Sequence, residues 1–158
     1  TRALSLREDE IIPCITPVGI PAERPTLTSR TIRTLARSDH RKPWESLFFS
    51  GSAGTPLDPA GAGRWKDCLE AVRLAPSASN RQPWRMLGRD GDFHLFLQPA
   101  GDYNKNAGTI ALQRVDMGIA MCHFQRLAES LHLGGRWVKS SVEPPDKRWI
   151  PIARWKSA

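Results

Sequence analysis

Two stretches of the chain carry apolar residues at helical spacing, and they predict the main helices. In the first stretch, four apolar residues recur at i, i+3, i+4 and i+7, namely Trp65, Cys68, Leu69 and Val72. This spacing places them on one face of a helix, as core positions. We expect the helix to span residues 59–74, because proline is favoured at the first helical position and Pro76 cannot continue a helix.

The second stretch, residues 109–133, predicts the longest helix. Within residues 115–124 only Asp116 and His123 are polar. A helix that is apolar nearly all round must be buried on most sides. We expect Asp116 to bond within the first turns of this helix and Gly134 to end it.

Strand patterns lie between the two helices. An Asp-Gly pair at positions 90–91 separates the apolar runs 84–87 and 93–97, and this arrangement is typical of a β-hairpin. His94 alternates with apolar neighbours, so we expect its side chain at the surface.

Further segments complete a mixed pattern of helices and strands. Residues 11–19 predict a strand near a sheet edge, because prolines remove ladder donors. A proline at the start of residues 43–49 favours a short helix, and residues 148–155 alternate as a closing strand. Together these elements predict an α+β fold, with a mostly antiparallel sheet packed by helices around a long buried central helix.

A polar loop connects the first helix to the hairpin. Residues 74–85 hold two hydroxyls, two carboxamides and one guanidinium between Pro76 and Pro83. Such groups can bind a planar, phosphorylated ligand. Serine and asparagine are also ordinary turn residues, so an ordinary capped loop is the alternative.

The loop sequence also resembles a known family. Residues 75–85, Ala-Pro-Ser-Ala-Ser-Asn-Arg-Gln-Pro-Trp-Arg, resemble the Pro-Ser-x-x-Asn-x-Gln-Pro-Trp stretch of the nitroreductase family of FMN-dependent oxidoreductases. In that family the loop lies against the FMN, which implies this role for Pro76, Ser77 and Asn80. Residues 113–120 resemble the family's central helix, which packs at a two-fold interface.

A second resemblance precedes the loop. Residues 19–23, Gly-Ile-Pro-Ala-Glu, are similar to the end of a late nitroreductase strand, with Ile20 where an aromatic residue is more usual. A basic segment after that strand holds the FMN phosphate in the family, which implies this role for Arg41, with Lys42 second. A guanidinium suits phosphate because it can form two charge-assisted hydrogen bonds. Simple surface exposure of these basic residues is the alternative.

The order of these segments resembles a subgroup in which two nitroreductase-type repeats are fused. Residues 1–45 are then expected to be the end of a first repeat, a strand plus a basic connector, and 46–158 a second repeat. The family's Arg-x-Ser-x-Arg phosphate-binding element has no counterpart among the residues given. The opposite wall of the site is therefore expected from a homodimer partner or from a first repeat.

The resemblance implies an FMN-dependent oxidoreductase with NAD(P)H as electron donor. Nitroaromatic, quinone or similar small molecules would be the electron acceptors, in a ping-pong mechanism without a protein acid or base. The alternative is a non-catalytic flavin-binding or interaction module, or a truncated inactive fragment. A cytoplasmic location is expected separately, because the sequence shows no signal peptide and no bilayer-spanning run, and its cysteines favour free thiols.

Charge and cysteine content narrow the choice of partners. The net charge is +7, but basic residues are interspersed with acids, so we expect a solvated surface and no nucleic-acid partner. No apolar run approaches the roughly 18 residues that span a bilayer, so no membrane partner is expected. The spacing of the cysteines at positions 14, 68 and 122 favours free thiols over a disulfide framework or a metal site.

Overall fold

The computed structural model describes residues 7–10, 12, 18–20, 31, 39–99 and 111–158. The expected strand over 11–19 falls largely outside the described residues, as does most of the basic connector that follows it. The first two residues of the expected 109–133 helix also lie outside them.

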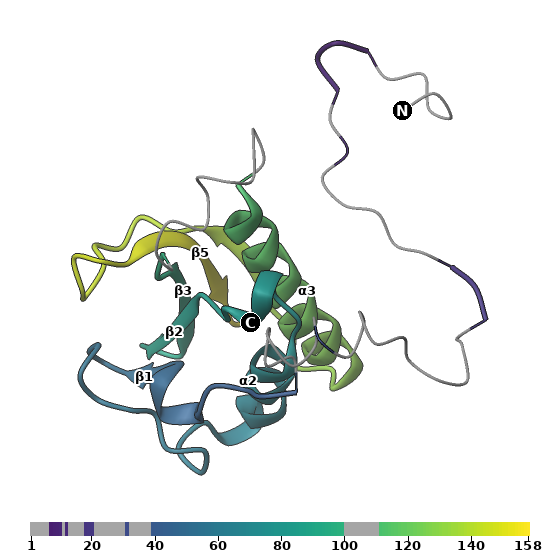
Figure 1. The fold of residues 1–158 in the computed structure, drawn as a ribbon. Helices are drawn as coiled ribbons and strands as arrows, with labels where there is room; N and C mark the ends of the chain where they lie inside the picture. Colours follow the sequence, from purple (N-terminus) through teal and green to yellow (C-terminus); the bar gives the residue numbers. More distant parts are fainter. Residues whose placement is uncertain (1–6, 11, 13–17, 21–30, 32–38, 100–110) are drawn as a thin grey trace.

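The described residues form a single mixed sheet with two α-helices on one of its faces (Figure 1). The strands are β1 (Phe48–Ser50), β2 (Trp84–Arg89), β3 (Asp92–Leu97), β4 (Arg136–Lys139) and β5 (Ile150–Lys156). They lie in the order β1-β2-β3-β5-β4, and only the pair β1 and β2 is parallel. The α-helices are α2 (Lys66–Leu74) and α3 (Leu112–Ser130). The α+β prediction is therefore confirmed.

The hairpin of β2 and β3 forms where the Asp-Gly pair predicts it. Asp90 and Gly91 both have left-handed backbone angles, with φ of 53° and 83°. A two-residue turn of this kind matches the natural twist of the two strands. The strands pair in register from Trp84 opposite Leu97 to the turn.

Helix α2 ends as expected but begins later than residue 59. Gly63 has a φ of 53°, which no helix interior adopts. A 3-10 turn, η2 (Gly63–Trp65), leads into α2 from there. The apolar face read from the sequence is buried, with Cys68, Leu69 and Val72 inaccessible to solvent.

The main core lies between the sheet and the two helices. Trp65 stacks on Phe124 of α3, with ring centroids 5.7 Å apart and an interplanar angle of 16°. Trp84 and Met86 of β2 face the same core. Burial of these aromatic and aliphatic side chains is the main force that holds α2 and α3 on the sheet.

The opposite face of the sheet carries a smaller cluster made of Phe49, Leu87, Phe96 and Trp149. His94 belongs to this face, and its ring centroid lies 6.5 Å from that of Phe96. Only 4% of His94 is exposed, so the prediction of a surface histidine is wrong. Strand alternation identifies the face of the sheet on which a side chain lies, but not whether another segment covers that face.

Two short strands, β1 and β4, escape prediction from the sequence. The expected 43–49 helix is reduced to a 3-10 turn, η1 (Trp44–Ser46). Phe48–Ser50 is instead β1, which pairs in parallel with β2, because Phe48 and Phe49 bury their rings on opposite faces of the sheet.

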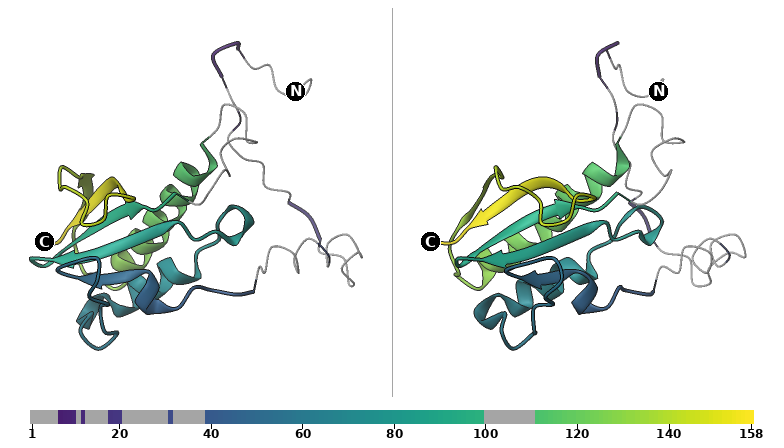
Figure 2. Two further views of the ribbon diagram at one scale, coloured as in Figure 1. Left: turned by 60° about the vertical axis from the view of Figure 1, so that its left-hand side comes forward. Right: turned by 90° about the vertical axis from the view of Figure 1, so that its left-hand side faces the viewer.

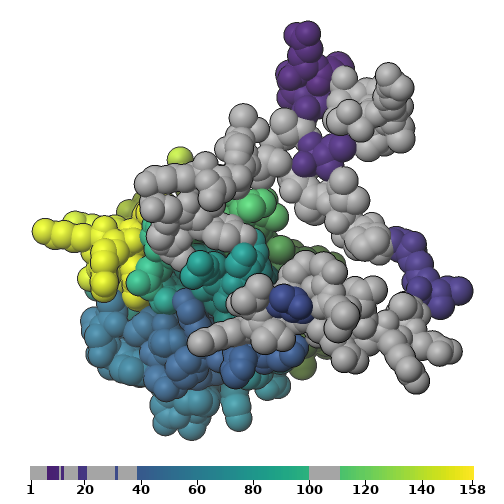
Figure 3. All heavy atoms as spheres, in the orientation of Figure 1, coloured from purple at the N-terminus to yellow at the C-terminus, as the bar shows by residue number. Residues whose placement is uncertain are grey.

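The outer strands define the two edges of the sheet. β1 lies at one edge and β4 at the other. In the space-filling view the blue segment that contains β1 lies low in the molecule, and the yellow carboxy-terminal segment that contains β5 projects to the left above it (Figure 3). Figure 2 shows the α2–β2 loop at the end of the sheet opposite the carboxy terminus.

Membrane-spanning geometry is not found in the described part of the chain. No helix there is both long and apolar enough to cross a bilayer.

Candidate functional site

The polar loop starts where α2 ends at Leu74. Ala75 has a φ of −55° and a ψ of 143°, because a residue before proline is pushed out of the helical region. A single 3-10 turn, η3 (Ala78–Asn80), follows. The expected end of the helix before Pro76 is confirmed, and Pro76 is exposed beside η3.

The backbone of this loop is strained. Ser79, Asn80 and Gln82 have φ angles of 47°, 53° and 46°. Residues other than glycine seldom adopt this region, although asparagine tolerates it better than most. Strain of this kind clusters at ligand-binding and active sites, where the surrounding structure maintains it.

Side chains of the loop maintain its shape. The hydroxyl of Ser77 accepts a hydrogen bond of 2.8 Å from the backbone N–H of Gln82. Gln82 donates through Nε2 to Oδ1 of Asn80 at 2.9 Å. Ser77 and Asn80, predicted as cofactor contacts, therefore also define the loop from within.

The basic segment packs directly against this loop. Nδ2 of Asn80 donates to the His40 carbonyl at 2.7 Å, and the Lys42 N–H donates to Oε1 of Gln82 at 2.7 Å. Arg41 donates to Oδ1 of Asn80 at 3.4 Å and to the Leu74 carbonyl at 3.3 Å. The structure thus brings Arg41 and Lys42 together with Ser77 and Asn80.

Positive charge is concentrated next to the contact between the basic segment and the loop. Burial, followed by repulsion from Arg85 and then Arg81, lowers the pKa of Lys42 to about 8. Lys42 Nζ donates to the Gln82 carbonyl at 3.3 Å. Cations beside strained backbone form an arrangement that can bind an anionic ligand.

Comparison with protein families identifies the family to which the chain belongs. A family described as "Putative TM nitroreductase" matches residues 2–128. The chain belongs to this nitroreductase family. The matched part includes the loop, Arg41, Lys42 and nearly all of α3. Membership supports a general oxidoreductase function of the nitroreductase type. Comparisons with curated proteins and with solved structures found no match.

Arg85 is a site residue that sequence reasoning did not single out. It lies on β2, and only 8% of it is exposed. Its Nη1 donates to the Gln82 carbonyl at 3.2 Å and also to the Trp84 carbonyl. Burial lowers its pKa to about 10. The available signal was a guanidinium inside an apolar strand, where burial of a charge is costly.

Asp116 also has a role different from the expected one. Its Oδ1 accepts the backbone N–H of Ala78 at 2.9 Å, so it bonds to the loop and not within the first turns of α3. Burial raises its pKa, and the bond from Ala78 partly opposes this. A residue of α3 thereby fixes the start of η3.

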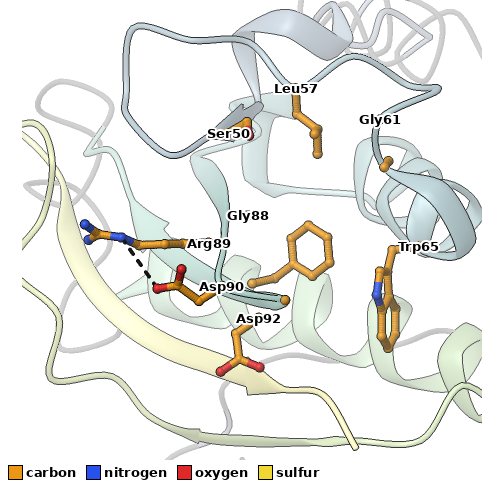
Figure 4. Close-up of a pocket in the computed structure, with 11 residues that line it drawn as sticks. Ser50, Leu57, Gly61, Trp65, Gly88, Arg89, Asp90 and Asp92 are labelled. Atoms are coloured by element: carbon orange, nitrogen blue, oxygen red, sulfur yellow. Dashed lines mark ion pairs between the residues drawn. The ribbon is translucent and has the colours of Figure 1, made fainter.

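A separate hollow lies at the β2–β3 turn. Figure 4 shows Leu57 and Trp65 beside it, and the carboxylates of Asp90 and Asp92 below. None of the five residues predicted to bind cofactor lines it. It is therefore distinct from the candidate site at the α2–β2 loop.

Clusters of metal-ligating side chains are not found in the described part of the chain. No group of three or more histidine, cysteine, aspartate or glutamate side chains there could hold a metal ion. Cys68 and Cys122 are free thiols, as their spacing predicts, whereas Cys14 lies outside the described residues.

Proposed function

We propose that this nitroreductase is an FMN-dependent NAD(P)H oxidoreductase that reduces nitroaromatic, quinone or similar acceptors in alternating half-reactions. One observation carries this proposal. The strained loop holding Ser77 and Asn80 is hydrogen-bonded to the basic segment holding Arg41 and Lys42.

The chemistry of these residues fits FMN. A phosphate monoester is an anion that accepts hydrogen bonds, and the Arg41 guanidinium and Lys42 ammonium are donors with positive charge. Pro76 offers an exposed apolar ring next to these polar groups, which suits a flat ring system. Asn80 acts mainly by holding the loop, because both ends of its carboxamide are hydrogen-bonded within the protein.

FMN, when bound, supplies the two-electron redox chemistry, while the protein supplies position and electrostatics. In this proposal Arg41 and Lys42 bind the phosphate, and Pro76, Ser77 and Asn80 form one wall of the site. No side chain is assigned a proton-transfer role.

A second wall comes from another nitroreductase-type repeat. We propose that residues 1–45 end a first repeat and that 46–158 form a second, with a homodimer partner as the other possible source. Gly118 and Cys122 support this idea, since both are exposed one helical turn apart on α3, between the exposed Arg114 and Arg126. Small residues permit the close approach of another helix or sheet.

The test is to follow the two half-reactions separately under anaerobic conditions. The protein is loaded with FMN, and NADPH or NADH is added while the visible absorbance band of oxidised flavin is recorded. The proposal predicts that the band bleaches and that a nitroaromatic or quinone then restores it. FMN binding without bleaching by either nucleotide would favour the non-catalytic flavin-binding module.

A further inference from the structure

Two cationic side chains meet at a single carbonyl oxygen. Lys42 Nζ and Arg85 Nη1 both donate to the backbone oxygen of Gln82, at 3.3 and 3.2 Å. Lys42 precedes the first strand, whereas Arg85 lies on β2 after the loop. Two like charges are therefore held close together by segments far apart in the sequence.

Rigid backbone contacts fix both residues. The Lys42 N–H is anchored on the Gln82 side chain at 2.7 Å, and Gln82 itself has a left-handed φ of 46°. Arg85 sits within the β2–β3 ladder opposite Phe96. This preorganisation means that a ligand would not have to order the two side chains, which favours binding.

Within the part of the chain that the structure describes, no counter-charge is paired with these two cations. Among the residues that the structure describes, no carboxylate lies within ion-pair distance of Lys42 or Arg85. Burial, followed by repulsion from Arg85 and then Arg81, also lowers the pKa of Lys42. Half-buried cations without a counter-charge are costly to the fold and are stabilised by a bound anion.

Free donors remain on the pair. The hydrogen bonds that Arg85 makes in the described part of the chain all come from Nη1, which leaves Nε and Nη2 to donate to another acceptor. The ammonium of Lys42 likewise has more protons than its one bond to Gln82 uses. The geometry of a guanidinium next to an ammonium suits a tetrahedral oxyanion.

We propose that Lys42 and Arg85 form a phosphate-binding subsite in which Arg85 is an essential and previously unassigned ligand. Arg41, the other proposed phosphate ligand, is held by different acceptors, the carbonyls of Leu74 and His40 and the Asn80 side chain. The phosphate group belongs either to FMN or to the nicotinamide nucleotide. Binding of the FMN phosphate at this subsite rests on the proposed function.

The experiment compares ligands that differ only by a phosphate. FMN and riboflavin are titrated by flavin fluorescence, NADPH and NADH by nucleotide fluorescence, and inorganic phosphate by calorimetry. The variants are Arg85→Gln, Lys42→Gln and the charge-preserving Arg85→Lys. Arg89→Gln is the matched control, because Arg89 is exposed at the other end of the same strand.

Arg85→Gln is expected to weaken the phosphorylated ligand by roughly tenfold to a hundredfold and to leave its unphosphorylated counterpart unchanged. Arg85→Lys should restore part of the loss, and Arg89→Gln should have no effect. If only the affinity for FMN falls, the subsite binds the flavin phosphate. If only the affinity for NADPH falls, it binds the nucleotide phosphate. Loss of riboflavin affinity to the same extent as FMN affinity would instead mean structural damage and would overturn the subsite.

The proposed function and the subsite can fail separately. If the unmodified chain binds neither flavin but binds phosphate through Arg85, the function fails and the subsite stands. If FMN binds, but neither Arg85→Gln nor Lys42→Gln changes the preference for FMN over riboflavin or for NADPH over NADH, the subsite fails and the function stands. Absence of binding to every phosphorylated ligand and to inorganic phosphate overturns both.

Discussion

Asp116 of the central helix holds the backbone of Ala78 in the loop. Its Oδ1 accepts the Ala78 N–H at 2.9 Å, whereas its Oδ2 is buried without a hydrogen-bond partner among the described residues. Ala78 directly follows Ser77, one of the proposed cofactor contacts. The position of the loop therefore depends on α3 as well as on the prolines that bracket it.

Asp116→Asn is predicted to change how stability depends on pH. Burial raises the native pKa of Asp116 above 3.8, so the native state binds more protons than the unfolded chain above that pH. The free energy of unfolding of the unmodified protein should fall as the pH rises from 3.8 through the raised native pKa. Asparagine keeps the acceptor for Ala78 but does not titrate, so this fall should disappear.

Urea unfolding at a series of pH values measures this effect. Asp116→Ala is the companion variant, because it removes the acceptor as well as the charge. It should cost about 1–3 kcal/mol at all pH values, since the Ala78 N–H loses its partner. Parallel pH profiles for the unmodified protein and Asp116→Asn would contradict the account of Asp116.

Asn80→Ala is predicted to weaken FMN binding by about tenfold and to destabilise the protein by about 1–2 kcal/mol. The alanine loses the bonds to His40 and Gln82 and must adopt a φ of 53°. Asp90→Ala is a matched control, because Asp90 has the same φ on the exposed hairpin turn. The control should lose stability but keep its FMN affinity; equal losses of affinity would remove Asn80 from the site.

The sequence predicts the secondary structure well where the pattern is local. Pro76 identifies the end of α2, and the Asp-Gly pair identifies the hairpin, because backbone constraints of individual residues decide both. The parallel strand β1 was missed, since its pairing with β2 depends on residues about 40 positions away. No local pattern encodes a partner at that distance.

In the candidate site, too, local motifs can be predicted from the sequence and long-range contacts cannot. The motif around Ser77 and Asn80 is readable from the sequence, and so is the basic segment with Arg41. The meeting of Lys42 with Arg85, and of Asp116 with Ala78, requires the folded chain. The sequence gives the residue types at these positions, but the contacts between them follow from tertiary packing.

Lys42 is predicted to titrate near pH 8 and to respond to Arg85. Its pKa is lowered to about 8 by burial and then by Arg85 and Arg81. Arg85→Gln should therefore move the pKa upward towards 10.5, while Arg89→Gln should leave it in place. NMR titration of the lysine side-chain nitrogens measures both values, and an unchanged Lys42 in Arg85→Gln would contradict their proximity.

The same shift has a consequence for stability. Between pH 8 and 10.5 the unfolded chain holds the Lys42 proton more tightly than the native state does. The free energy of unfolding contributed by this group therefore rises with pH across that window. Lys42→Gln should remove the rise, as measured by urea unfolding above pH 7.

His94→Phe is predicted to improve stability in acid. Burial lowers the native pKa of His94 below 6.5, with Arg154 as the next cause, so protonation favours the unfolded chain as the pH falls through and below 6.5. Its Nδ1 is buried without a hydrogen-bond partner among the described residues, so phenylalanine should cost little. Thermal unfolding from pH 7 downwards tests this, with His132→Asn as an exposed control; a fall as steep in His94→Phe as in the unmodified protein would contradict it.

The central claim is that the loop around Ser77 and Asn80, together with Arg41, binds FMN. Titration of FMN with the purified protein, followed by flavin fluorescence, tests this claim most directly. We predict a saturable change in fluorescence at a fixed stoichiometry, which unfolding of the protein in urea abolishes. FMN fluorescence that remains unchanged up to a large excess of folded protein would contradict the claim.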